Sequence, residues 1–380
     1  MSWKPAVTET RADFTAVNLI TGFLGSGKTT LLKRLLADPS LADTAVLINE
    51  FGEVGLDHHL LERIDDNIVL LQSGCLCCTI RGELADSLRS LHSKRERGEV
   101  PWFKRVVIES TGLADPFPIL STIHADPVLR HHFQLGHVVT VVDAVNGDLQ
   151  LDVYEQSVKQ AAIADRLVLT KAGLAGVGPT GTLVERLRTL NPLAPLVNAE
   201  HDEIDADALL CTDLLDMSRK TPAAQQWFAS EHTPSGWLLQ QDDAAPGNAE
   251  PSSAQRPGSY LRPKGRLRPA ATRHSDAIRA FSMVLAEPLD WTRFGIWLTM
   301  LVHRHGSKIL RIKGILNVQG SEHPVAVHGV QHLIHPPIHM AGWPNEGRHS
   351  QLVFIVNGLD AQMVKRSLQA FLAVPVLAAV

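Results

Sequence analysis

Two groups of residues in the first part of the chain have types and spacings that could do chemistry. The first is the run Gly-Phe-Leu-Gly-Ser-Gly-Lys-Thr over residues 22–29, a complete GxxxxGK[ST] phosphate loop that can grip a polyphosphate through backbone N–H groups. The second is Cys75, Cys77 and Cys78, whose thiolates suit a soft metal ion such as Zn²⁺ or Cu⁺. A nucleotide site and a thiol cluster in one domain predict metal handling coupled to nucleotide hydrolysis.

The segments around the phosphate loop have the order that such a loop requires. Val17–Thr21 is typical of a strand, and Lys28–Leu36 has the apolar spacing of a helix whose N-terminus would point at the phosphates. We expect Lys28 to contact the β and γ oxygens and the Thr29 hydroxyl to ligate Mg²⁺. The glycines that permit positive φ and a close approach of the phosphates are Gly22, Gly25 and Gly27.

An acidic residue at the end of a later strand is a second signal for the same site. Arg105–Ile108 reads as a buried strand, Glu109 follows it, and Gly112 lies three positions further on. This pattern suits an indirect contact to Mg²⁺ and a backbone amide that senses the γ-phosphate. The alternative is a solvated Glu109. We expect Lys28, Thr29 and Glu109 to catalyse hydrolysis by positioning and charge neutralisation, without a covalent intermediate.

Recognition of the base departs from the usual pattern. A guanine site commonly ends a strand with [NT]-K-x-D, where the aspartate accepts hydrogen bonds from the N–H groups of guanine. Here the residues are Thr170-Lys171-Ala172-Gly173. Thr170 and Lys171 are expected at the base, and the lysine can pack over the ring. Because the bidentate acceptor is missing, discrimination could fall by roughly 10²–10⁵. We predict GTP as the nucleotide and leave its selectivity open.

The three clustered cysteines follow the expected strand Asn67–Leu71 and precede a helix that opens near Arg81. A helix N-terminus lowers thiol pKa values, which favours the metal-binding thiolate. Adjacent side chains such as Cys77 and Cys78 diverge, so these sulfurs cannot enclose a tetrahedral ion alone, and the site should be open. The alternative is that two of the cysteines are small apolar core residues.

At least one further metal ligand must therefore come from another segment. Glu50 and Glu53 are candidates, because they lie in the loop after the expected strand Thr44–Ile48 and hence at the same sheet edge as the phosphate loop. Glu53 is preferred. Cys211 is isolated in the sequence and is expected to be inert.

Composition limits the class of protein. At 380 residues the chain predicts two or three domains, and a net charge of −4 with mixed signs predicts no large face for nucleic acid or anionic lipid. The N-terminal residues lack the apolar region of a secretory signal, and nowhere do 18 or more apolar residues run together. Four cysteines, three of them clustered, do not make a disulfide framework. We expect a soluble cytoplasmic protein that binds neither nucleic acid nor membranes.

Short apolar runs alternate with helical spacing over the first part of the chain, which predicts an α/β domain with a parallel sheet over residues 14–230. The expected strands are Val17–Thr21, Thr44–Ile48, Asn67–Leu71, Arg105–Ile108, Val138–Val142, Leu167–Leu169 and Pro195–Val197. The expected helices are Lys28–Leu36, Arg81–Lys94, Tyr154–Ile163 and Thr182–Leu190.

A linker and a smaller domain are expected to follow. Residues 240–273 are rich in Pro, Ser, Gly and Arg and cannot bury enough apolar surface to order themselves, so a flexible linker is predicted. Residues 277–380 are predicted to form an α+β domain. Its expected strands are Ala280–Leu285, Lys308–Leu316, Glu322–His328 and Gln351–Val356, with a helix at Trp291–His303.

Histidines are frequent, 18 in all, and are densest in the last third of the chain. Neutral imidazoles could collect zinc or cobalt there transiently, although an ordinary surface rich in histidine explains the same pattern. This series comprises His303, His305, His323, His328, His332, His335, His339 and His349.

Four motifs in this order resemble the CobW-type GTPases, which include zinc chaperones and nitrile hydratase activators. They are the phosphate loop, Asn-Glu-Phe-Gly-Glu-Val-Gly at 49–55, Gly-Cys-Leu-Cys-Cys at 74–78 and Glu-Ser-Thr-Gly-Leu-Ala-Asp-Pro at 109–116. The resemblance continues through Val-Val-Asp-Ala at 141–144 and into the second domain at Arg-Ile-Lys-Gly, 311–314, and His-Gly-Val-Gln, 328–331. It covers nearly the whole chain outside the linker.

The resemblance implies a GTP-dependent metallochaperone that delivers a metal to a client metalloprotein. It adds Ser26 and Thr30 to the phosphate-binding residues and makes the three clustered cysteines the CxCC metal ligands, with Glu53 nearby. Gly173 departs from the family, which usually has an aspartate there. Other readings stay open: a metal storage or sensing protein with a regulatory nucleotide site, or a cobalt-delivery accessory in cobalamin synthesis. The client, the metal among Zn²⁺, Co²⁺ and Fe²⁺, and the oligomeric state, including a homodimer, also stay open.

Overall fold

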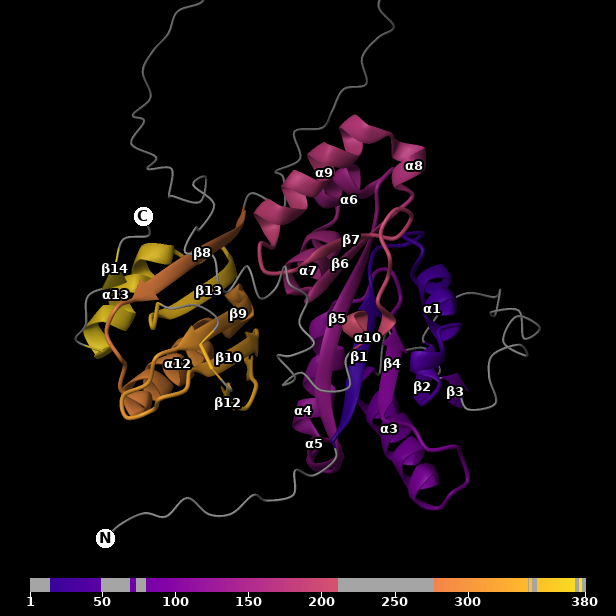
Figure 1. The fold of residues 1–380 in the computed structure, drawn as a ribbon, viewed down its shortest axis with the longest axis horizontal. Coiled ribbons are helices and arrows are strands. Elements are labelled where there is room, and N and C mark those ends of the chain that lie inside the picture. Colours follow the sequence, from indigo (N-terminus) through magenta and orange to yellow (C-terminus); the bar gives the residue numbers. More distant parts are fainter. Residues whose placement is uncertain are drawn as a thin grey trace, which may run out of the picture.

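The computed structural model describes residues 14–48, 69–72, 80–210, 277–340, 342–343, 347–372 and 376–377. These residues form two β-sheets with helices, placed side by side (Figure 1). The first part of the chain contains one sheet and the part after residue 277 contains the other. The expected linker, residues 240–273, lies outside the described residues, so the proposed domain limits remain a prediction.

The first sheet has seven parallel strands in the order β3-β2-β4-β1-β5-β6-β7. All their carboxyl ends therefore lie at one edge, where ligands bind in open α/β sheets. The strands are β1 (Thr15–Thr21), β2 (Thr44–Ile48), β3 (Val69–Gln72), β4 (Arg105–Glu109), β5 (Phe133–Asp143), β6 (Arg166–Thr170) and β7 (Leu196–Asn198).

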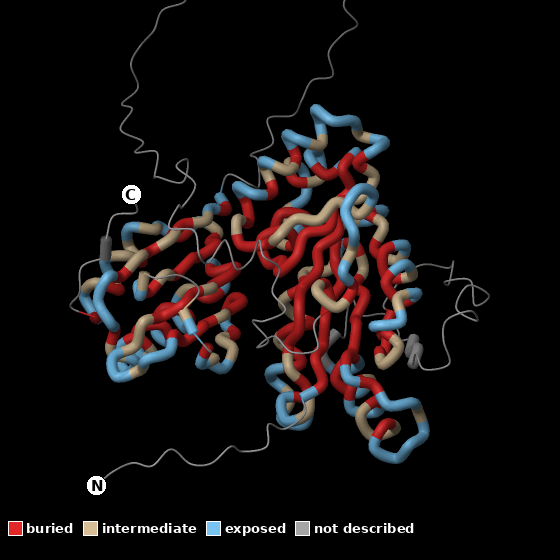
Figure 2. Tube along the Cα trace, viewed as in Figure 1, coloured by how far each residue is buried: buried red, intermediate tan, exposed pale blue. Residues whose placement is uncertain are grey.

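Helices cover both faces of this sheet, because alternate strand residues enter separate apolar clusters. In β1, Val17 and Leu19 face one cluster and Ile20 faces the other. The Ile20 side is covered by α1 (Lys28–Leu36) and α10 (Ala206–Leu209). The other side is covered by α3 (Ile80–Glu96), α4 (Pro116–Ala125), α5 (Pro127–His132), α6 (Gly147–Val153), α7 (Glu155–Ile163) and α9 (Val177–Leu190). Figure 2 shows the strands as the buried centre of the domain.

The second sheet is antiparallel, with the order β11-β10-β9-β13-β8-β14 and β12 paired to β10. One face packs against α12 (Trp291–His305) and α13 (Ala361–Leu372) around Trp297 and Phe354. The strands are β8 (Ile278–Leu285), β9 (Ile309–Leu316), β10 (Val325–Val330), β11 (Leu333–Ile334), β12 (Ile338–His339), β13 (Ser350–Asn357) and β14 (Val376–Leu377). This confirms the predicted class, a parallel-sheet domain followed by a smaller α+β domain.

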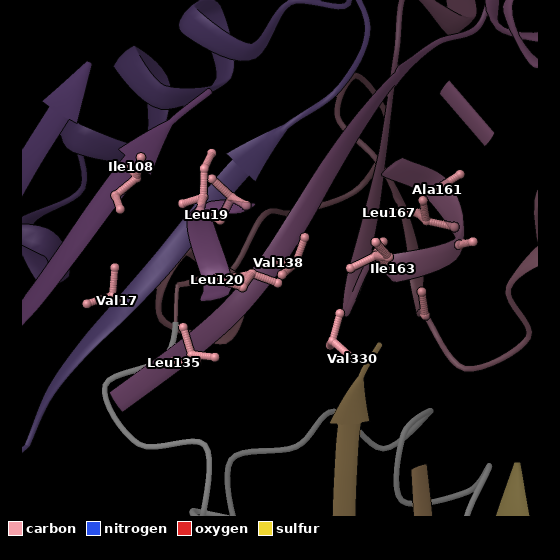
Figure 3. Close-up of a cluster of buried hydrophobic side chains, with 14 of the residues drawn as sticks. Val17, Leu19, Ile108, Leu120, Leu135, Val138, Ala161, Ile163, Leu167 and Val330 are labelled. Carbon is pink, nitrogen blue, oxygen red and sulfur yellow. The ribbon is translucent and has the colours of Figure 1, made fainter. Parts of the chain in front are cut away.

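The second sheet also contributes to the core of the first domain. Val353 and Ile355, which alternate with Phe354 on β13, belong to the same buried cluster as Ile163 at the end of α7. Val330 of β10 joins this cluster from the second domain (Figure 3). The contact between the domains is thus part of a continuous apolar core.

A buried ionic group lies within this interface. Asp165, between α7 and β6, forms an ion pair with Arg311 and another with Lys313 at 2.8 Å, and both cations come from β9. Burial alone would raise the pKa of Asp165, but the two cations hold it well below its usual value. Burial lowers the pKa of Lys313 to about 8, despite the opposing effect of Asp165.

Most expected elements are present, and several are longer or additional. The strand Thr44–Ile48 and the helix Lys28–Leu36 have the expected limits. Helices α4, α5, α6 and α13 were not expected, and β5 begins at Phe133 rather than Val138. No helix within the described ranges is long and apolar enough to cross a membrane.

Candidate nucleotide site

The phosphate loop joins the end of β1 to the start of α1, as the sequence predicts. Gly22, Gly25 and Gly27 all have positive φ, of 140°, 72° and 93°. A Cβ at Gly22 would collide with the carbonyl oxygen of Val141 on β5, so a side chain is excluded there. Gly27 caps α1, whose first N–H groups then face the loop. The loop has the form of an anion-binding turn at a helix N-terminus.

Lys28 and Thr29 are the first two residues of α1. Lys28 is buried, 8% exposed, and its Nζ donates to the carbonyl of Phe23 across the loop at 3.1 Å. The Thr29 hydroxyl donates to Glu109 Oε1 at 2.6 Å, so the first turn of α1 and the end of β4 meet directly. Ser26 Oγ is buried and has no hydrogen-bond partner among the described residues. These groups match the donors and hard oxygen atoms that a Mg²⁺-polyphosphate requires.

Gly112 lies against the phosphate loop, where a Cβ would approach the backbone nitrogen of Leu24 to 2.5 Å. Gln160, in the middle of α7, donates from Nε2 to the carbonyls of Gly112 and Ala114 at 3.2 and 3.0 Å. Tyr154, which precedes the same helix, packs its ring on Phe23 of the loop with centroids 4.5 Å apart. Helix α7 therefore contacts both the phosphate loop and the segment after β4.

The expected base-side residues also reach the phosphate loop. Thr170 Oγ1 donates to the carbonyl of Ser26 at 2.7 Å. Lys171, in the left-handed region with φ 58°, donates from Nζ to the carbonyl of Gly25 at 2.7 Å and pairs with Asp143 at 2.8 Å. Burial alone would raise the pKa of Asp143, but hydrogen bonds from Lys171, Asn146 and the backbone of residue 145 lower it. Lys171 is thus held across the loop as a cation.

Three residues at this site were missed from the sequence: Asp143, Gln160 and Glu200. Asp143 was quoted only as part of a motif, yet a carboxylate that ends a strand opposite a lysine-containing strand end is a usable signal. Glu200 accepts a hydrogen bond from the backbone N–H of Gly173 at 2.7 Å. Gln160 has no sequence signal, because its two partners are backbone carbonyls more than forty positions away.

The expected metal ligands Cys75, Cys77, Cys78 and Glu53 lie outside the described residues, as does Cys211. The described residues that flank the three cysteines are Gln72 at the end of β3 and Ile80 at the start of α3. Within the described ranges, no group of three or more His, Cys, Asp or Glu side chains could hold a metal ion. Thr30, also expected to bind phosphate, is an exposed residue in the first turn of α1.

The fold and the loop define a P-loop NTPase domain: a parallel sheet, a glycine-rich loop leading into a helix, and an acid at the end of the neighbouring strand. The nucleotide-binding domain model of CobW/HypB/UreG matches residues 16–198, and the C-terminal domain model of the cobalamin synthesis protein cobW matches residues 278–372. The chain belongs to the CobW family, and the prediction of this family and of a P-loop enzyme is confirmed.

Relatives support the same assignment. The zinc chaperone YjiA of Escherichia coli (strain K12) is 32% identical over 340 residues, covering 90% of this chain and 93% of that protein. The zinc-regulated GTPase metalloprotein activator 1 of Schizosaccharomyces pombe is 33% identical over 50% of this chain and 46% of that protein. The crystal structure of Zn(II)-bound YjiA GTPase from E. coli matches with a TM-score of 0.63 and 28% identity, covering 94% of this chain and 99% of that chain.

Proposed function

We propose that the protein is a GTP-hydrolysing metallochaperone that binds zinc, or a related divalent metal, and transfers it to a client metalloprotein. Cys75, Cys77 and Cys78 hold the metal together with Glu53. The nucleotide binds at the phosphate loop, with Lys28 on its β and γ oxygens and the base near Thr170 and Lys171. Loss of the γ-phosphate reorganises the segments that carry the metal ligands, and the metal leaves.

The proposed phosphate site fits a Mg²⁺ ion. The Thr29 hydroxyl and the Glu109 carboxylate lie 2.6 Å apart, and both are hard oxygen ligands of the kind that Mg²⁺ prefers. When bound, the ion would neutralise charge on the β- and γ-phosphates. Lys28 adds a positive charge at the helix N-terminus, and the backbone of Gly112 lies against the same loop. Catalysis in this proposal consists of positioning and charge stabilisation.

The single observation that carries the coupling is a row of paired residues across the sheet. Ile48 of β2 pairs with Glu109 on one side and with Gln72 on the other. At about 4.8 Å between strands, Gln72 lies roughly 10 Å from Glu109. The cysteine segment begins directly after Gln72, and the segment with Glu53 begins directly after Ile48. Both proposed metal-binding segments therefore leave the sheet at the phosphate edge.

The names of two relatives support zinc as the cargo. YjiA is named a zinc chaperone, and its crystal structure contains Zn(II). A Zn(II)-bound structure also exists of a YjiA triple mutant in which one glutamate and two cysteines are replaced by alanine. Zinc binding outside a thiol site must therefore be separated from binding at Cys75, Cys77 and Cys78 in any test.

The test compares zinc affinity and GTP turnover in the wild type, Cys77→Ala and the control Cys211→Ala. Zinc is titrated against a chromophoric chelator, and phosphate release is followed in the same samples. We expect Cys77→Ala to bind the tight zinc at least about tenfold more weakly, from the loss of one ligand, and to lose the zinc dependence of turnover. Cys211→Ala should behave as the wild type. Identical zinc affinity and turnover in Cys77→Ala would contradict the proposal.

Transfer is tested by zinc release to the chelator after nucleotide addition. Release should be faster with GTP than with a non-hydrolysable analogue, because the proposal links it to loss of the γ-phosphate. Equal release rates would contradict transfer driven by hydrolysis and would favour the alternative of a metal storage protein with a regulatory nucleotide site. Within the described ranges the histidines of the second domain form no metal cluster, so nothing specific there favours the storage alternative.

A further inference from the structure

A carboxylate lies at the base side of the nucleotide site, although the local motif lacks one. The backbone N–H of Gly173 donates to Glu200 Oε2 at 2.7 Å. A Cβ built on Gly173 would lie 3.1 Å from the same oxygen. An [NT]-K-x-D aspartate would extend its side chain from this position. Glu200 therefore brings an acidic group to the place where the motif normally supplies one.

Strand pairing explains how a residue 27 positions away reaches Gly173. β6 and β7 are parallel neighbours, and Leu169 pairs with Asn198, so the two strands end within one residue of each other. Glu200 follows β7 by two residues, and Gly173 follows β6 by three. The register of the sheet, rather than local sequence, thus brings the two together.

Hydrogen bonds fix the loop that carries Glu200. The N–H of Ala199 donates to the carbonyl of Leu169 at 2.8 Å, and the N–H of Glu200 donates to Asn198 Oδ1 at 3.0 Å. Asn198 in turn donates from its backbone to Asp202 Oδ2 at 2.7 Å and accepts from the N–H of Asp202 at 2.9 Å. The backbone of this loop is therefore held on both sides of Glu200, and the carboxylate itself is held by the N–H of Gly173.

The carboxylate keeps free acceptor capacity. Oε2 accepts one hydrogen bond from Gly173, while Oε1 accepts none from the described residues, and Glu200 is exposed to solvent. An ionised carboxylate is an acceptor only. Guanine presents two adjacent donors, the ring N1–H and the amino group at C2, whereas adenine presents an acceptor at N1 and no amino group at C2. Glu200 suits guanine and repels adenine.

We propose that Glu200 is the residue that selects guanine in this protein, in place of an aspartate at position 173. This inference rests on the proposed function, because it assumes that a nucleotide base lies near Thr170 and Lys171. Glycine at 173 belongs to the arrangement, since a side chain there would crowd the Glu200 oxygen. Glu200, distant in sequence, thus supplies the carboxylate acceptor that an aspartate at position 173 would otherwise offer to guanine.

Isothermal titration of the full chain with GDP, inosine diphosphate and ADP tests this assignment. The wild type should prefer GDP to ADP, and GDP to inosine diphosphate, which lacks the C2 amino group. Glu200→Gln should reduce the GDP-to-ADP preference by about 10–100-fold, the value of one charge-assisted hydrogen bond. It should also abolish the discrimination against inosine diphosphate, and ADP affinity should stay the same or rise, because the negative charge that repels adenine N1 is gone.

The matched control is Glu203→Gln, an exposed glutamate in the same loop, which should leave all three affinities at wild-type values. In a second variant, Glu200→Ala combined with Gly173→Asp should restore the GDP preference that Glu200→Ala alone loses. A wild-type GDP-to-ADP ratio in Glu200→Gln would overturn this assignment while the proposed GTPase stands. Equal affinity of the wild-type protein for GDP and ADP would overturn both this assignment and the choice of GTP.

Discussion

Replacing Asp165 by asparagine should destabilise the contact between the two domains strongly. Asp165 is buried, 4% exposed, and its carboxylate is paired with Arg311 and Lys313 of β9. Asp165→Asn keeps the shape and one acceptor but removes the only charge that compensates these two cations within the described interface. The cost depends on what each cation can do next.

The two cations respond differently to the loss. Burial lowers the pKa of Lys313 to about 8 even with Asp165 present, so without Asp165 its pKa falls further and the lysine escapes most of the penalty by losing its proton. Arg311 stays charged at any accessible pH, and its side chain is 6% exposed. An uncompensated buried charge costs about 3–5 kcal/mol. We therefore expect Asp165→Asn to lose about 3–5 kcal/mol, carried mainly by Arg311.

Urea unfolding, read by hydrogen exchange in peptides from α7 and β9, measures this loss where it occurs. Asp165→Asn combined with Arg311→Met should regain most of the lost stability, because no buried charge is then left alone. The control is Asp86→Asn, which breaks an exposed pair with Arg89 and should cost less than about 1 kcal/mol. The reasoning fails if Asp165→Asn unfolds with the wild type, or if the double variant is no more stable than the single one.

Three further outcomes are expected. His335 is buried, and its pKa is lowered to about 4, mainly by burial and then by the charge of Arg311. As the pH falls, this histidine is protonated in the unfolded chain before it is protonated in the folded chain. The free energy of unfolding should therefore fall by about 2 kcal/mol between pH 7 and pH 5. In His335→Leu this part of the pH dependence should be absent when urea midpoints are compared between pH 7 and pH 5. The same pH dependence as in the wild type would contradict this expectation. Gln160→Leu removes the donor to the carbonyls of Gly112 and Ala114 and should cost about 1–3 kcal/mol in urea unfolding, so a loss under about 0.5 kcal/mol would count against the role of this side chain. Thr29→Ala should reduce the rate of phosphate release from GTP by about 100-fold or more, while circular dichroism shows that the chain stays folded. Turnover near the wild-type rate would contradict the proposed role of Thr29 as a Mg²⁺ ligand.

Much of the first domain was predictable because its sheet is buried on both faces and its strands are continuous apolar runs. Helices α4 and α5 were missed because Pro116, Pro118 and Pro127 resemble helix breakers. Proline in the first turn is compatible with a helix, and the preceding aspartates cap both: Asp115 accepts from the N–H of residue 117, and Asp126 from those of residues 128 and 129.

The length of β5 was missed for a different reason. Gly136 and His137 interrupt its apolar pattern, yet both lie inside the sheet, where the Asn18 side chain accepts a hydrogen bond from the N–H of His137 at 2.9 Å. A Cβ at Gly136 would lie 2.6 Å from the same Asn18 oxygen, so the glycine makes room for this polar contact. A buried asparagine that requires a glycine on the next strand is a pairwise feature, which no local pattern contains.

The candidate site divides in the same way. Residues that lie in one contiguous motif, such as Lys28 and Thr29, could be singled out from the sequence, and the structure places Thr29 against Glu109. Glu200 could not be predicted, because its proximity to Gly173 depends on the register between β6 and β7. Local motifs predict where a phosphate should bind, whereas the proposed selection of the base depends on contacts between separate strands.

Helix α7 links the phosphate loop of the first domain to the sheet of the second domain. Tyr154, directly before the helix, packs on Phe23 of the phosphate loop, and Gln160 donates to the carbonyl of Gly112. Asp165, two residues after the end of the helix, pairs with Arg311 and Lys313 of β9. At 1.5 Å per residue this rod is about 14 Å long, too short to bend appreciably. If nucleotide binds at the phosphate loop as proposed, a shift of α7 would therefore be transmitted to the contact between Asp165 and β9, and the second sheet would respond to the state of the loop.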